Sequence, residues 1–145
     1  MKSLKNIKIR EAEPLDFEKL ENILIQNNML HTSEIDGKES MYRIKERMGR
    51  YFLIAEMENS IVGLVRGVYD GSRALVHQIA IDIKYQKQGI DTILMSEIAL
   101  RFKEDGASTI AVTSTKDAES FYKKLKFFDV QINCMVAFDI NKCIR

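Results

Sequence analysis

The stretch of this sequence best suited to bind an anion is a polar loop in which a glycine opens a helical pattern. It runs from the apolar residues Ile79-Ala80-Ile81 through Gln86, Lys87, Gln88 and Gly89 to Ile90, Asp91 and Thr92. The first N–H groups of a helix lack intrahelical partners and carry partial positive charge, and glycine lets the backbone approach a ligand closely. The loop therefore predicts a phosphate or pyrophosphate site, although an ordinary strand–turn–helix junction has the same composition.

Other cofactor and metal signatures are missing from the sequence. It contains neither the GxxxxGKS/T loop of P-loop proteins nor the GxGxxG fingerprint of dinucleotide-binding folds. Cys134 and Cys143 form no CxxC pair, and together with His31 and His77 they make a poor zinc set. We therefore expect reduced thiols and no metal, and no Ser-His-Asp combination stands out.

Composition and charge exclude several functional classes. The 145 residues fit a single domain, 1–145, and a content of 46% hydrophobic and 30% charged residues is typical of a globular protein. The 22 basic and 21 acidic residues nearly cancel, which argues against nucleic acid as a partner. The sequence has no run of about 20 apolar residues, which a membrane-spanning helix needs. It also shows no signal-peptide pattern. We expect a cytoplasmic protein without a membrane partner.

Hydrophobic periodicity and turn residues predict a mixed α/β domain. In chain order, the patterns predict a strand at 7–10, helices around 17–24 and 41–48, strands at 51–56, 61–69 and 73–83, a helix at 90–102, a strand at 109–113, a helix at 118–125 and closing strands at 128–132 and 135–140. Asp70-Gly71 is a strong hairpin signal. The strand–helix–strand unit at 73–113 implies one parallel pair in a mostly antiparallel sheet.

This element order and two motifs resemble the GCN5-related N-acetyltransferase (GNAT) superfamily. The motifs are Gln86-x-x-Gly89-x-Asp91 after the strand Ile79-Ala80-Ile81, and Ala118-x-x-Phe121-Tyr122 followed by Leu125-x-Phe127. The likeness covers essentially the whole chain and is sharpest over residues 76–128. It implies one GNAT domain whose central mixed sheet contains a splayed parallel strand pair and carries helices on both faces.

The resemblance also implies an activity and a cofactor. It implies an acetyl-CoA-dependent N-acyltransferase in which an amine attacks the acetyl group directly, in a ternary complex. The pantetheine arm would pair with the strand edge at Ile79, Ala80 and Ile81, and the pyrophosphate would bind amides from Lys87 to Thr92. Gln86 and Thr115 complete the expected cofactor site, with Tyr122.

Two residues take the family's catalytic positions. Tyr122 occupies the place of the tyrosine that protonates the CoA thiolate. His77 stands where many relatives carry a Glu that acts as the general base. Imidazole has a reference pKa near 6.5 and could accept the proton of the amine through a water. Tyr122 could instead be a surface residue of an amphipathic helix, His77 could be a sheet histidine without a role, and a water chain could serve a neutral amine.

Three departures from the family pattern leave a second interpretation open. Asp91 stands where the family has Gly or Ala, Thr115 where it has Asn, and Lys126 where it has Gly. An anion at the pyrophosphate site would favour a degenerate GNAT-fold protein with weak or no CoA binding that acts as an interaction module. For an active enzyme the resemblance implies a small-molecule amine or a protein amino group as acceptor, and a homodimer is an open expectation.

Overall fold

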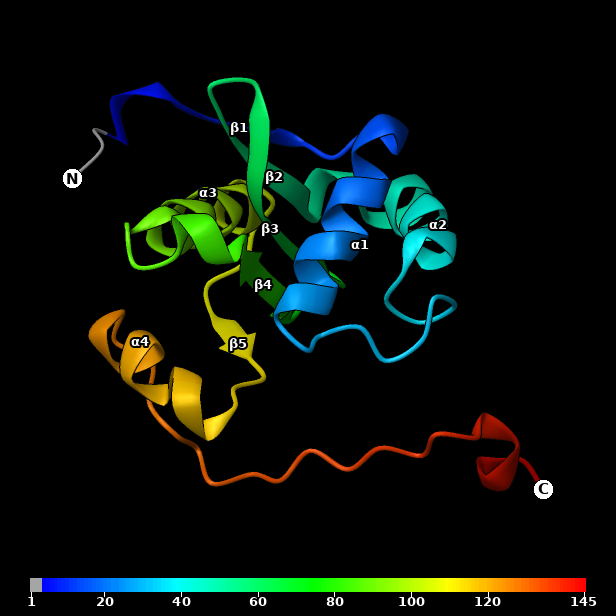
Figure 1. The fold of residues 1–145 in the computed structure, drawn as a ribbon. Coiled ribbons are helices and arrows are strands. Elements are labelled where there is room, and N and C mark those ends of the chain that lie inside the picture. Colours follow the sequence, from blue (N-terminus) through cyan, green and yellow to red (C-terminus); the bar gives the residue numbers. More distant parts are fainter. Residues whose placement is uncertain (1–3) are drawn as a thin grey trace. The chain divides into compact units, whose positions relative to one another are not determined.

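The computed structural model describes residues 4–145 (Figure 1), which divide into two compact units, 4–112 and 113–145. The first unit contains β1 (Ile7–Glu11), α1 (Phe17–Gln26), α2 (Lys38–Met48), β2 (Phe52–Met57), β3 (Ser60–Tyr69), β4 (Ala74–Ile81), α3 (Ile90–Glu104) and β5 (Ile110–Val112). The second unit contains α4 (Glu119–Lys124). The predicted order of elements is confirmed through α4.

The first unit is built on a mixed five-stranded sheet. The strands lie in the order β1-β2-β3-β4-β5, and β4–β5 is the parallel pair while the other three pairs are antiparallel. The hairpin between β3 and β4 forms where Asp70-Gly71 predicts it. Asp70 Oδ1 accepts hydrogen bonds from the Ser72 and Arg73 N–H groups, and Gly71 takes a positive φ of 95°.

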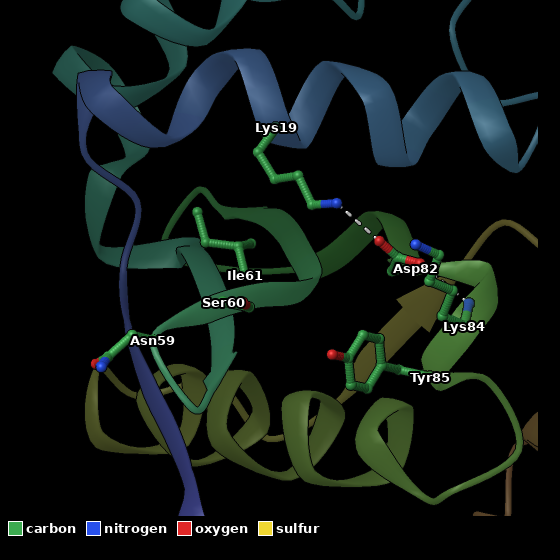
Figure 2. Close-up of a pocket in the computed structure, with 7 residues that line it drawn as sticks. All are labelled: Lys19, Asn59, Ser60, Ile61, Asp82, Lys84 and Tyr85. Carbon is green, nitrogen blue, oxygen red and sulfur yellow. Dashed lines mark hydrogen bonds and ion pairs between the residues drawn. The ribbon is translucent and has the colours of Figure 1, made fainter.

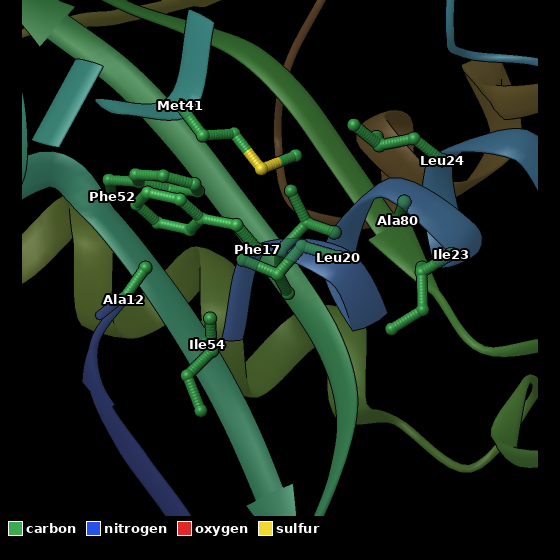
Figure 3. Close-up of a cluster of buried hydrophobic side chains, with 10 residues drawn as sticks. Ala12, Phe17, Leu20, Ile23, Leu24, Met41, Phe52, Ile54 and Ala80 are labelled. Carbon is green, nitrogen blue, oxygen red and sulfur yellow. The ribbon is translucent and has the colours of Figure 1, made fainter. Parts of the chain in front are cut away.

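Helices cover both faces of this sheet. On one face, α1 and α2 pack on β2, β3 and β4 around a core that is shown in Figure 3 and includes Phe17, Leu20, Ile23, Leu24, Met41, Phe52, Ile54, Leu64 and Ala80. On the other face, α3 lies so close that a Cβ on Gly63 would be 3.2 Å from Leu94 and one on Gly67 would be 3.0 Å from Phe102. These two glycines let α3 approach β3, as the expected placement of helices on both faces of the sheet requires.

A bulge in β4 separates two differently paired halves of the strand. Arg66 pairs with Gln78 but Gly67 pairs with Val76, so His77 is the extra residue of β4. The parallel pairing of β4 with β5 ends at Val76. From His77 to Ile81 the outer edge of β4 therefore has no strand beside it within residues 4–112. This is the splayed pair that the family resemblance implies.

The second unit differs from the prediction after α4. Residues 128–132 and 135–140 were predicted as closing strands, and this prediction is wrong: the described residues of this unit contain no strand. Alternating apolar residues indicate a face that can be buried, but a strand also needs a hydrogen-bonded neighbour. Phe128, Ile132 and Met135 instead have exposed fractions of 81%, 80% and 92%. Cys134 and Cys143 are exposed free thiols.

Candidate functional site

The outer edge of β4 can bind an extended ligand through its backbone. The Asp82 N–H donates to the Val62 carbonyl at 2.8 Å, which makes these opposed residues a hydrogen-bonded pair of the β3–β4 ladder. Such pairs alternate along an antiparallel ladder, so Ala80 also bonds toward β3 whereas Ile79 and Ile81 direct their N–H and C=O groups outward. Ile79 and Ile81 thus lie along the part of the edge that β5 leaves uncovered.

One of these outward groups already has partners. The Ile81 carbonyl accepts hydrogen bonds from Asn27 Nδ2 at 3.0 Å and from Gln86 Nε2 at 3.1 Å, and Gln86 Nε2 also lies 3.0 Å from Asn27 Oδ1. Gln86 therefore joins the loop after β4 to the end of α1. Sequence reasoning missed Asn27, because a contact 54 residues away along the chain leaves no local pattern.

The loop before α3 presents a helix N-terminus at the end of the same strand. Gly89 has a φ of 86° directly before Ile90, a conformation that favours glycine, and Lys87 also has a positive φ of 64°. The first-turn amides of this 15-residue helix are suited to an anion. The Gln88 Oε1 atom is buried in this loop and has no hydrogen-bond partner among the residues that the structure describes.

The Asp91 side chain is already hydrogen-bonded to one of these amides. Its Oδ1 atom accepts a hydrogen bond from the Thr92 N–H at 2.8 Å. The carboxylate thus satisfies one of the donors that a helix end leaves without an intrahelical partner. A phosphate bound to the same turn would have to displace this carboxylate or lie beside it.

His77 is an exposed residue at the bulge, one position before Gln78. Partial desolvation lowers the pKa of the imidazole, the positive charge of Arg66 lowers it further, and the negative charge of Asp36 opposes both effects. A histidine whose pKa lies below 6.5 is mostly neutral at pH 7. It can therefore accept a proton.

A hollow of about 400 Å³ lies on the α1 side of the first unit (Figure 2). It is lined by Lys19, Asn59, Ser60, Ile61, Asp82, Lys84 and Tyr85. Burial acts to raise the pKa of Asp82, but hydrogen bonds from Lys19 Nζ at 2.8 Å and from the Lys84 N–H hold it below its ordinary value. None of the residues predicted from the sequence lines this hollow.

The second unit holds the remaining predicted residues, Thr115 and Tyr122. Tyr122 is 7% exposed, and its ring lies against those of Phe121 and Phe127 with centroids 5.0 and 5.5 Å away. Lys126, which stands where the family has Gly, takes the left-handed conformation with a φ of 71°. The Thr115 carbonyl accepts from the Ala118 N–H at 3.1 Å at the start of the segment that leads into α4.

Metal and membrane features are missing from the part of the chain that the structure describes. Residues 4–145 contain no group of three or more His, Cys, Asp or Glu side chains placed to hold a metal ion. Within the same residues, no helix has both the length and the apolar character needed to cross a membrane.

Comparisons with known proteins match this chain to a family of acetyltransferases. The model of the acetyltransferase (GNAT) domain family matches residues 24–137. An acetyltransferase from Sodalis glossinidius is 29% identical over 79 residues, which are 52% of this chain and 56% of that protein. The match thus spans little more than half the length of this curated relative.

Solved structures share the fold at low sequence identity. The crystal structure of Ard1 from Thermoplasma volcanium has a TM-score of 0.75 at 21% identity, and the match covers 84% of this chain and 82% of that one. A diaminobutyrate acetyltransferase from Paenibacillus lautus, solved with its substrate and coenzyme A, has a TM-score of 0.70 at 16% identity over 83% of this chain and 73% of its own.

Proposed function

Because the chain belongs to the acetyltransferase (GNAT) domain family, we propose that it is an N-acyltransferase that moves the acetyl group of acetyl-CoA to a primary amine. Acyl transfer is the general chemistry of this family, and the relatives named above are acetyltransferases. The acceptor would be a small-molecule amine or a protein amino group. A homodimer in the cytoplasm, with no metal, no nucleic acid and no membrane partner, completes the proposal.

One observation carries this function: β4 leaves an uncovered edge that runs directly toward the N-terminus of α3. In our proposal the edge at Ile79, Ala80 and Ile81 takes the pantetheine arm, as a peptide strand is taken in β-augmentation. The amides from Lys87 through Gly89 and Ile90 to Thr92 take the pyrophosphate. Gln86 and Gln88 lie in this loop, and the family resemblance adds Thr115 and Tyr122 to the proposed cofactor-binding residues.

The reaction needs three proton transfers besides the bond changes: one from the ammonium, one onto the leaving thiolate and one from the nitrogen once it is bonded to the acetyl carbon. The amine nitrogen forms a bond to the acetyl carbon and the carbon–sulfur bond breaks, so CoA leaves as a thiolate. We assign to neutral His77 the role of general base that takes the ammonium proton through a water. We assign to the Tyr122 phenol the role of general acid that protonates the thiolate and then recovers a proton from the newly bonded nitrogen.

A thermal-shift titration with CoA and acetyl-CoA tests the first step of this proposal. Ligand at 100 times its Kd stabilises a fold by about 2.7 kcal/mol, so Tm should rise with either compound. Adenosine is the matched control, because it lacks the pyrophosphate and the pantetheine arm and should not shift Tm. Transfer is then measured as release of free thiol from acetyl-CoA with a panel of amines.

A second function is favoured by the carboxylate of Asp91 on the Thr92 amide. If this anion excludes the pyrophosphate, the chain is a GNAT-fold interaction module with weak or no CoA binding. Unchanged Tm and no calorimetric heat at millimolar CoA would overturn the enzyme proposal and support this one.

A further inference from the structure

A polar cluster lies beside the bulge of β4, on the sheet face that α1 and α2 cover. Arg66 of β3 donates from Nε to Gln78 Oε1 at 2.7 Å, and its second terminal nitrogen lies 3.4 Å from Asp36 Oδ1. Gln78 of β4 in turn donates from Nε2 to the same Asp36 oxygen at 3.1 Å. Two side chains, one from β3 and one from β4, thus converge on one carboxylate oxygen of the segment between α1 and α2.

This cluster fixes the connection between α1 and α2. Gln78 Nε2 also donates to the Met29 carbonyl at 3.1 Å, and the His31 N–H donates to the other Asp36 oxygen at 2.9 Å. Residues at both ends of the 29–36 segment are therefore held against β3 and β4. The side chains of Arg66 and Asp36 are only 17% and 11% exposed, so each charge relies on the other for compensation.

The same two charges are the ones that act on His77. Gln78 directly follows His77, and Arg66 pairs with Gln78 across the ladder. Arg66 favours the neutral imidazole and Asp36 favours the charged one. On the other side of β4, the pairing with β5 ends at Val76, one residue before His77, and the β5 residues Ile110, Ala111 and Val112 carry no titratable group.

We propose that Arg66, Gln78 and Asp36 are positioning residues that dock the α1–α2 connection beside the bulge and fix the electrostatic environment of His77. The catalytic consequence rests on the proposed function, since it requires His77 to be the base. The arrangement itself makes a prediction that holds without any activity. Removing the positive charge and removing the negative charge must change the proton affinity of His77 in opposite directions.

The test is an NMR titration of the full chain, which has two histidines, His31 and His77. The His77 signal is assigned by its loss in His77→Gln. Arg66→Met should raise the pKa of His77, and Asp36→Asn, which keeps an acceptor oxygen, should lower it. Glu34→Gln is the matched control: it removes one exposed negative charge from the same connection and should leave the His77 pKa unchanged.

Docking is measured on the same variants by hydrogen exchange. The His31 amide bonds to Asp36, so its exchange should be faster in Asp36→Asn and in Gln78→Ala than in the parent or in Glu34→Gln. If the opposite pKa shifts are found, the proposal stands whether or not the protein transfers acetyl groups. Equal pKa values in all variants, or shifts of the same sign in Arg66→Met and Asp36→Asn, would overturn it.

If transfer is observed, kinetics separate positioning from simple packing. The acidic limb of the kcat/KM profile should move up in Arg66→Met and down in Asp36→Asn, following the NMR values. A uniform loss of activity with an unmoved acidic limb would show that the cluster only supports the fold.

Discussion

Asp91 offers the sharpest test of the cofactor site, because its carboxylate lies on the helix turn where the pyrophosphate is expected. Asp91 Oδ1 is 2.8 Å from the Thr92 nitrogen. A phosphate oxygen on a neighbouring first-turn amide would lie about 5 Å from this oxygen, since each hydrogen bond spans about 3 Å. Two negative charges at about 5 Å repel by about 0.8 kcal/mol in water-like surroundings and by about 3.3 kcal/mol at an effective dielectric of about 20.

These limits translate into affinities. Removing the charge should tighten CoA binding by about 4-fold to about 250-fold, since each 1.4 kcal/mol is a factor of about ten. Thr92 is exposed to solvent, and solvent weakens the repulsion between charges, so we expect the lower part of this range. The gain should shrink as salt is raised from about 0.05 to about 0.5 M, because screening already weakens the repulsion.

Two variants separate charge from hydrogen bonding in this experiment. Asp91→Asn removes the charge but keeps an oxygen that can accept from the Thr92 N–H, whereas Asp91→Gly also frees that N–H. Calorimetric Kd values for CoA should fall in both, and further in Asp91→Gly. Without ligand, Asp91→Gly should be less stable by about 1 kcal/mol, because it loses a capping group and helix propensity.

Glu39→Gln is the matched control, since Glu39 lies in the first turn of α2, away from the loop before α3. Its CoA affinity should equal that of the parent. If neither Asp91 variant binds CoA more tightly at low salt, the phosphates do not approach this turn, and the pyrophosphate site that we assign to α3 is wrong.

Three further predictions concern single residues. His77→Gln should abolish the acidic limb of the kcat/KM profile, which in the parent should fall below pH 6.5 because the pKa of His77 is lowered; an identical profile would assign the base elsewhere. Tyr122→Phe should reduce kcat by about 10²–10⁴-fold with little change in CoA affinity, and undiminished turnover would remove its role as general acid. The pKa of Asp82 is held below 3.8, so its carboxylate stabilises the fold above that pH and this contribution is lost as pH falls through the lower folded value. Tm measured from pH 7 to pH 2 should therefore decline less in Asp82→Asn than in the parent, and parallel declines would contradict the pairing with Lys19.

The elements of the first unit could be predicted from the sequence because local residues specify their turns and helix starts. The Asp70-Gly71 turn fixes the β3–β4 hairpin, and Gly89 fixes the start of α3 because its positive φ favours glycine. The strand at 73–83 was predicted two residues too long at its C-terminal end, since β4 ends at Ile81 and Ile83 begins a 3-10 turn.

Contacts between distant segments were not predictable in this way. Asn27 reaches Ile81 across 54 positions, and Arg66 reaches Asp36 across 30. Each of these residues has an ordinary local context, and its partner is decided only when the helices pack on the sheet. The prediction of closing strands at 128–132 and 135–140 was wrong for a related reason. An alternating pattern specifies which face of a strand is apolar, but not which strand lies beside it.

The bulge at His77 lies between the part of β4 that pairs with β5 and the part whose outer edge is uncovered. It also changes which face of the sheet the following side chains occupy, because side chains alternate between the faces of a strand. Gln78 shares a face with Ala80 and the α1–α2 core, whereas Val76 pairs with Gly67, whose missing Cβ points at Phe102 of α3. In an uninterrupted strand residues 76 and 78 would lie on the same face. One extra residue therefore lets β4 pair with β5 up to Val76 and present Gln78 to the α1–α2 connection. His77 is that residue, so the proposed base lies where the paired and the uncovered parts of the strand meet.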